Sequence, residues 1–97
     1  MRKDELIQAI SDRTGLTRTD VKHVIDAFIS IVKDQLISGD SVVMRGFGTF
    51  MTRTRKPRVA RDINRNKPIY LPERRVPFFK PSNKLVKEVD RASSIVK

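Results

Sequence analysis

The chain has 97 residues, enough for one small domain, and carries a formal net charge of +10 with a pI near 10.7. The absence of cysteine excludes disulfides and thiolate metal sites. No apolar run reaches the length of a signal peptide or a membrane span, so we expect a soluble cytoplasmic protein with a polyanionic partner.

The first forty residues are typical of two helices. Gly15 can end the first helix because glycine readily adopts the left-handed backbone conformation. Thr17 and Asp20 resemble a capping box, with Asp20 in the place that glutamate usually holds. We therefore expect the second helix to run from about Arg18 to Ser38.

Apolar side chains in this second helix cover an arc of about 160° when residues are spaced at 100°. The residues of the arc are Val21, Val24, Ile25, Phe28, Ile29, Ile31, Val32 and Leu36. One short helix is too narrow to cover such a stripe, so the arc predicts an obligate dimer in which a partner chain covers the rest. His23 lies opposite the arc, where we expect it to be solvated.

After Gly39 the apolar period shortens to two residues, which is typical of strands. We expect strands over residues 41–45, from 49 onward, around 69–71 and over 76–80, with turns at 46–48 and 61–66. Pro57 restricts ladder pairing to an edge or a bulge, and Ser82 caps a short C-terminal helix. The fold class is therefore α+β, with an antiparallel sheet of three strands that extends into a long β-arm.

The positive charge is concentrated in the middle of the chain. Residues 1–44 hold six basic and seven acidic side chains, whereas residues 45–80 hold eleven basic and two acidic ones. A charge run is often only a solvated face, but this run is internal and flanked by apolar strands. The arm has no evident hydrophobic face and would project about 30 Å. This pattern favours a mobile arm that becomes ordered on a charged ligand.

Two motifs resemble the HU/IHF family of bacterial histone-like, DNA-bending proteins. The sequence GFGTF at 46–50 matches the family signature at the strand turn, and VPFFKP at 76–81 resembles its second signature, where the arm returns to the body. The sequences DELI at 4–7 and TGLT at 14–17 are also similar, so the resemblance covers nearly the whole chain.

The resemblance implies an intertwined dimer, an HU-like homodimer above all, although a heterodimer with a paralogue stays open. Within a single domain over 1–97, residues 1–40 would form the helical dimerisation base and residues 41–81 the sheet, with the arm at about 53–71. Residues 82–97 would form the C-terminal helix and tail. The arms would enter the minor groove and hold bent DNA.

The tip of the arm departs from the family pattern. Where the family usually has Arg-Asn-Pro, this chain has Arg61, Asp62 and Ile63. The family proline enters a base step, and isoleucine is also among the side chains that wedge into DNA. We expect Ile63 to intercalate; the alternative is that it packs on the tip or on the sugar edges. Asp62 is less favourable, because it brings a carboxylate close to phosphates.

Basic side chains are the candidate DNA contacts, because guanidinium groups suit a narrow minor groove and fork onto phosphates. The arm candidates are Arg53, Arg55, Lys56, Arg58, Arg61, Arg65 and Lys67, together with the apolar wedge Ile63, and those on the body are Arg75, Lys80, Lys84, Arg45 and Lys3. We expect the arginines at positions 53, 55, 58 and 61 to line one DNA-facing path.

Nothing in the sequence favours an enzyme, a metal site or a cofactor, since no catalytic triad, metal-spaced cluster or phosphate loop occurs. Phe47, Phe50 and Phe79 fit a core better than a base-stacking platform. The leading hypothesis is a nucleoid protein that binds bent, nicked or flexible double-stranded DNA with little sequence preference. An IHF-like, sequence-preferring factor and a structural RNA-binding protein stay open as alternatives.

Overall fold

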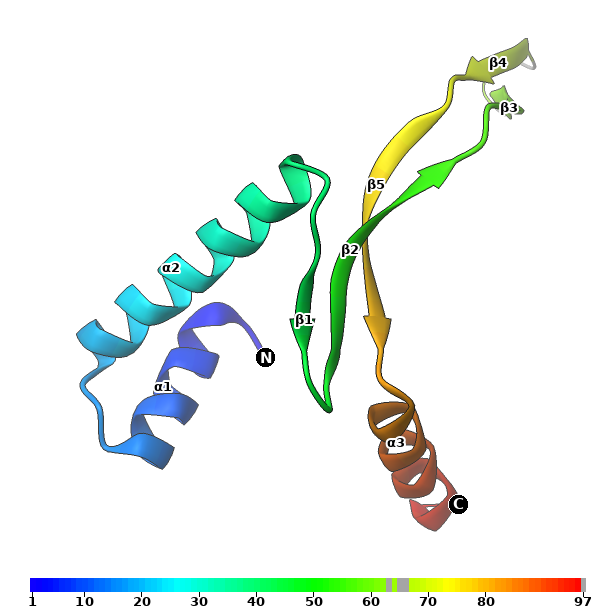
Figure 1. The fold of residues 1–97 in the computed structure, drawn as a ribbon. Helices are drawn as coiled ribbons and strands as arrows, with labels where there is room; N and C mark the ends of the chain where they lie inside the picture. Colours follow the sequence, from blue (N-terminus) through cyan, green and yellow to red (C-terminus); the bar gives the residue numbers. More distant parts are fainter. Residues whose placement is uncertain (63, 65–66, 97) are drawn as a thin grey trace. The chain divides into compact units, whose positions relative to one another are not determined.

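The structure is a computed structural model that describes residues 1–62, 64 and 67–96. Its elements are α1 (Lys3–Thr14), α2 (Arg18–Ile37), β1 (Val42–Met44), β2 (Gly48–Arg55), β3 (Arg58–Asp62), β4 (Lys67–Leu71), β5 (Arg74–Pro81) and α3 (Asn83–Val96) (Figure 1). They fall into two compact units, Met1–Gln35 and Leu36–Lys97. The predicted α+β class is confirmed. No helix within the described ranges is long and apolar enough to cross a membrane.

The two N-terminal helices begin and end close to the predicted positions because local hydrogen bonds fix their ends. Gly15 follows α1 with a φ of 78°, and its N–H donates to the carbonyl oxygen of Ser11 at 2.9 Å. At the start of α2, the hydroxyl oxygen of Thr17 accepts a hydrogen bond from the N–H of Asp20 at 3.1 Å. The helix ends at Ile37, one residue before the predicted end.

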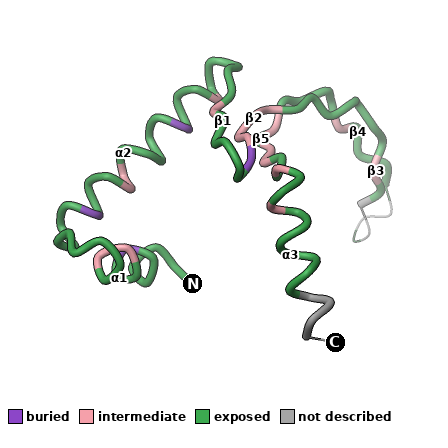
Figure 2. The backbone as a smooth tube through the Cα atoms, turned by 60° about the horizontal axis from the view of Figure 1, so that its bottom comes forward, coloured by how far each residue is buried: buried purple, intermediate pink, exposed green. Residues whose placement is uncertain are grey.

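Only part of the apolar arc on α2 is buried in the single chain (Figure 2). Val21 is 2 % exposed and Val32 is 9 % exposed, whereas Val24 and Ile31 are more than half exposed. Ile7 of α1 completes the set of buried apolar residues within the described part of the chain. Exposed apolar surface of this extent on a helix is typical of a protein–protein interface and not of a surface that faces solvent.

The sheet has the strand order β1–β2–β5, and both pairings are antiparallel. A tight turn joins β1 to β2, with Gly46 at a φ of 80°. Gly48 leaves no room for a side chain, because a Cβ atom there would lie 2.5 Å from Cζ of Phe79. The ring of Phe79 lies 5.2 Å from that of Phe47 and 5.0 Å from that of Phe50. Phe47 is nevertheless 47 % exposed, so its predicted burial is wrong for the single chain.

The arm is a separate sheet, which corrects the prediction of one continuous hairpin. The ladder between β2 and β5 ends at the pair Arg55 and Arg74, and β3 pairs with β4 from Arg58 and Leu71 onward. The residues between the two ladders are Lys56, Pro57, Pro72 and Glu73. Proline lacks the N–H that a ladder needs, so a proline in each strand interrupts the pairing at the same level.

The C-terminal helix is longer than predicted. Ser82 caps it as expected, because its hydroxyl oxygen accepts a hydrogen bond from the N–H of Leu85 at 3.1 Å. The helix then continues for 14 residues to Val96. Since no glycine or proline occurs between Asn83 and Val96, nothing in the local sequence ends it earlier.

Candidate nucleic-acid interface

A basic hollow of about 350 Å³ lies where the sheet gives way to the arm. Its lining residues are Arg53, Thr54, Arg55, Lys56, Arg58, Leu71, Pro72 and Arg74. Five of these eight side chains are cationic and none is acidic. We call these five cations, at positions 53, 55, 56, 58 and 74, the junction cluster. The structure thus brings together four of the residues that the sequence predicted as DNA contacts.

Arg74 belongs to this cluster although the sequence analysis did not single it out. The register of β2 and β5 places Arg74 directly opposite Arg55. Like charges in directly opposed strand positions repel each other, so the pair is unfavourable until an anion lies between or beside the two guanidinium groups. The pairing register would have identified Arg74, because counting along both strands from the pair Gly48 and Pro81 leads to the pair Arg55 and Arg74.

The prediction that four arginines line one path needs correction at the arm. Successive side chains of a strand point to opposite faces, so Arg53 and Arg55 share a face of β2 as expected. Arg58 and Arg61 are three positions apart on β3, and their side chains therefore leave opposite faces of the two-stranded sheet. Arg61 is exposed, as is Lys67 at the start of β4. Ile63 and Arg65 lie outside the described residues.

A second basic site lies on the body near the turn at Gly46. Arg45 and Lys80 contribute to the lining of a hollow of about 330 Å³, together with Ser82 and Asn83 at the start of α3. The first turn of α3 contains no acidic residue, so the positive end of its helix dipole is not neutralised there. Lys84 follows in this turn and is exposed, but it does not line the hollow.

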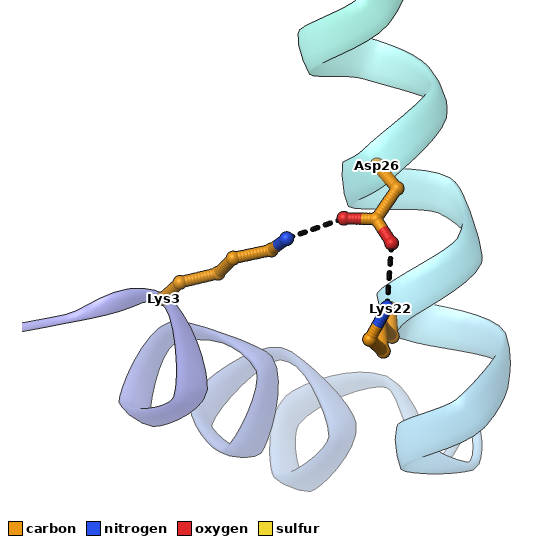
Figure 3. Close-up of polar contacts among 3 residues, drawn as sticks. All are labelled: Lys3, Lys22 and Asp26. Carbon is orange, nitrogen blue, oxygen red and sulfur yellow. Dashed lines mark hydrogen bonds and ion pairs between the residues drawn. The ribbon is translucent and has the colours of Figure 1, made fainter.

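Lys3 is engaged within its own unit. Its Nζ atom lies 2.5 Å from Oδ1 of Asp26, while Nζ of Lys22 lies 2.8 Å from Oδ2 of the same carboxylate (Figure 3). The hydrogen bonds from Lys22 and Lys3 lower the pKa of Asp26 to about 2, and Asp26 in turn raises the pKa of Lys22. Lys3 can meet a phosphate only by leaving or sharing this carboxylate.

Arg75 also has an internal partner. Its Nη2 atom donates a hydrogen bond to the carbonyl oxygen of Ile37 at 2.8 Å. The carbonyl groups of the last helical turn lack partners within the helix, so this guanidinium group caps the C-terminal end of α2. The two adjacent arginines at 74 and 75 therefore lie in different surroundings, because the strand sends them to opposite faces.

The described residues contain no group of three or more histidine, cysteine, aspartate or glutamate side chains suited to a metal ion. His23 is exposed, as predicted. The arrangement of groups is one for holding an anion: exposed guanidinium and ammonium groups on strands, and a helix N-terminus with free positive charge nearby.

Three comparisons place the chain among known proteins. Residues 1–90 match the family described as bacterial DNA-binding protein. The chain is 40 % identical over 93 residues to DNA-binding protein HU of Campylobacter jejuni, covering 96 % of this chain and 95 % of that protein. It is 38 % identical over 96 residues to integration host factor subunit beta of Methylococcus capsulatus, covering 98 % of each.

A solved structure gives the same result for the fold. The Anabaena HU–DNA cocrystal structure superposes with a TM-score of 0.86 at 31 % identity, covering 92 % of this chain and 97 % of that one. The family match over residues 1–90 includes both of the sequence signatures, at 46–50 and 76–81. The chain belongs to the HU/IHF family of bacterial DNA-binding proteins.

Proposed function

We propose that a dimer of this chain binds double-stranded DNA and bends it, with little sequence preference and without catalysis. The junction cluster carries this proposal. Five cations and no acidic side chain line one hollow, and Arg55 and Arg74 oppose each other across two strands. Such a cluster attracts a polyanion, and a DNA backbone supplies one phosphate after another along its length.

The arm and the body have different parts in this proposal. The arm, residues 53–71, enters the minor groove with its arginines, and Ile63 at the tip wedges into a base step. The body hollow, with Arg45, Lys80 and the nearby Lys84, holds the backbone of DNA that continues past the arm. Arg61, Arg65 and Lys67 add contacts along the arm, while Lys3 and Arg75 contribute only when they leave their internal partners.

A second chain completes the helical base formed by residues 1–40. The exposed apolar side chains of α2 support this, because Val24 and Ile31 are 64 % and 59 % exposed in the single chain. Burying such residues at an interface stabilises a dimer by about 25 cal/mol for each Å² removed from water. The partner is a second copy of the same chain, and a paralogous chain is the alternative.

Relatives with both HU and IHF names match the chain at similar identity, which leaves sequence preference as the property to measure. A DNA-bending protein of this kind works in the bacterial nucleoid, and we propose that location. Competition between random duplexes and duplexes selected for binding separates the two modes. Equal affinities support the HU-like mode; a preference of a hundredfold or more supports the IHF-like mode.

Bending and salt dependence test the proposal together. We expect a duplex with fluorophores at both ends to show greater energy transfer when the protein is added. DNA affinity should fall steeply with salt. A plot of log affinity against log salt concentration should have a slope of about −4 or steeper, because five cations per arm displace counterions. Bent or nicked DNA should bind more tightly than linear DNA, and A-form RNA most weakly.

A matched pair of variants links the result to the junction cluster. Arg74→Gln and Lys33→Gln each remove one positive charge, but Lys33 is an exposed residue of α2 outside both hollows. Arg74→Gln should weaken binding and flatten the salt slope by about two units, one for each chain of the dimer, whereas Lys33→Gln should change neither. A slope near zero, or a stronger affinity for A-form RNA than for DNA, would remove the proposal.

A further inference from the structure

Two consecutive phenylalanines in β5 lie on opposite faces of the sheet. Phe79 points to the face where its ring meets those of Phe47 and Phe50. Phe78 pairs with Met51 in the register and therefore shares the other face with Met51 and Arg53. A large aromatic side chain thus lies on the same face as the arginines at the root of the arm.

The ring of Phe78 has a specific partner on that face. The central carbon of the Arg53 guanidinium group lies 4.7 Å from the ring centroid, within the range of about 6 Å for a cation–π interaction. Phe78 is half-buried, so part of its ring packs against the protein, while Arg53 is exposed. Arg53 has no ion pair with any residue that the structure describes.

This contact restrains the Arg53 side chain but leaves its charge and its N–H donors available. A carboxylate partner would neutralise the guanidinium charge and occupy its N–H donors, whereas an aromatic ring does neither. A long arginine side chain loses rotamer freedom when it binds a phosphate, and a side chain already held in place loses less. The ring therefore prepares Arg53 for an anion that approaches from the solvent side.

We propose that Phe78 is a positioning residue that holds Arg53 ready to bind the DNA backbone at the root of the arm. This inference rests on the proposed function, since it assigns a residue that acts through one of the DNA contacts. Arg55 is two residues along the same strand face, but it lies opposite another arginine, Arg74, whereas Arg53 lies opposite Val76 and beside the Phe78 ring. The chain thus provides its own comparison for a DNA contact without an aromatic support.

A double-mutant cycle tests the inference with the full-length protein and a nicked duplex. Phe78→Leu keeps an apolar side chain and removes the ring, and it should weaken binding by about two- to fivefold per arm at low salt. In an Arg53→Gln background, Phe78→Leu should have no further effect on affinity. In an Arg55→Gln background, Phe78→Leu should lower DNA affinity by the same factor as in the wild type, because the two changes are independent.

The conservative variant separates positioning from general support of the fold. Phe78→Tyr keeps the ring and should bind as the wild type does, whereas Phe78→Leu should also shift the NMR signals of the Arg53 side chain in the free protein. Thermal midpoints of all variants identify any loss through unfolding. The positioning role would be overturned if Phe78→Leu lowered DNA affinity equally in the wild-type and Arg53→Gln backgrounds. Weak binding by Phe78→Tyr would overturn it as well. Failure of the wild type to bind DNA would instead overturn the proposed function.

Discussion

Arg75 caps the carbonyl oxygen of Ile37, the last residue of α2, through a 2.8 Å hydrogen bond from Nη2. Arg75→Ala should therefore lower the free energy of unfolding by about 1 kcal/mol, because a charged donor leaves a helix terminus. Urea unfolding of the full chain measures this change. The change in DNA affinity should be small.

Arg74→Ala is the matched contrast to Arg75→Ala, since it removes the same side chain one position earlier. It relieves the repulsion with Arg55, so stability at low salt should stay equal or rise by a few tenths of a kcal/mol. DNA affinity should fall more than for Arg75→Ala. The reverse ranking of the two variants in affinity would contradict the division between the junction cluster and the helix cap.

Gly48→Ala should destabilise the sheet. The added methyl group would lie 2.5 Å from Cζ of Phe79 and 2.7 Å from the carbonyl oxygen of Lys80, so a strand or a ring must move. Overpacking of this kind costs about 1–3 kcal/mol. Thermal unfolding measures the loss. Gly15→Asn is the control: asparagine tolerates a φ of 78°, and no atom lies within 4 Å of the new Cβ position.

Asp26 should make folding stability depend on pH in the acid range. Its pKa falls from the ordinary 3.8 to about 2 through the hydrogen bonds from Lys22 and Lys3. The folded state therefore binds the proton less readily than the unfolded state does. The stabilisation is present above pH 3.8 and disappears as the pH falls toward 2.

The difference in stability between the wild type and Asp26→Asn should accordingly shrink between pH 4 and pH 2. Salt should reduce it as well, because the carboxylate and both ammonium groups are exposed. An NMR titration of the Asp26 carboxyl carbon reports the midpoint directly. A midpoint near 3.8 would show that the two lysines do not hold this carboxylate in solution.

Ile63→Ala tests the wedge that the resemblance predicts at the arm tip. Truncation of the wedge should reduce the bend angle more than the affinity, because most binding energy comes from phosphate contacts that the variant keeps. Energy transfer across a doubly labelled duplex measures the angle, and Ile63→Pro, which restores the family residue, should bend DNA at least as strongly. Unchanged bending by Ile63→Ala would reject the wedge.

The sequence predicted the features that short-range chemistry decides. The caps at Thr17 and Ser82, the helix end at Gly15 and the turn at Gly46 follow from backbone preferences that a few neighbouring residues set. The predicted excess of apolar surface on α2 is also observed, since helical periodicity alone fixes which side chains share a face.

The sequence did not predict the features that depend on pairing between distant segments. Arg74 joins the junction cluster because of its register opposite Arg55, and Arg75 reaches Ile37 across 38 positions of the chain. The pairing of Lys3 with Asp26 has the same origin, because two helices have to pack before these side chains meet. Charge alone indicated where an anion would bind but not which cations are already occupied.

The two prolines between the ladders affect how the sequence of such a protein can evolve. Pro57 and Pro72 leave the arm joined to the body by two short segments without ladder hydrogen bonds. Substitutions beyond these two prolines would alter the residues that we propose face DNA and would leave the ring contacts around Phe79 in place. The arm is in this sense a module, and a graft of residues 58–71 from another member of the family could transfer that member's way of reading DNA without redesign of the body.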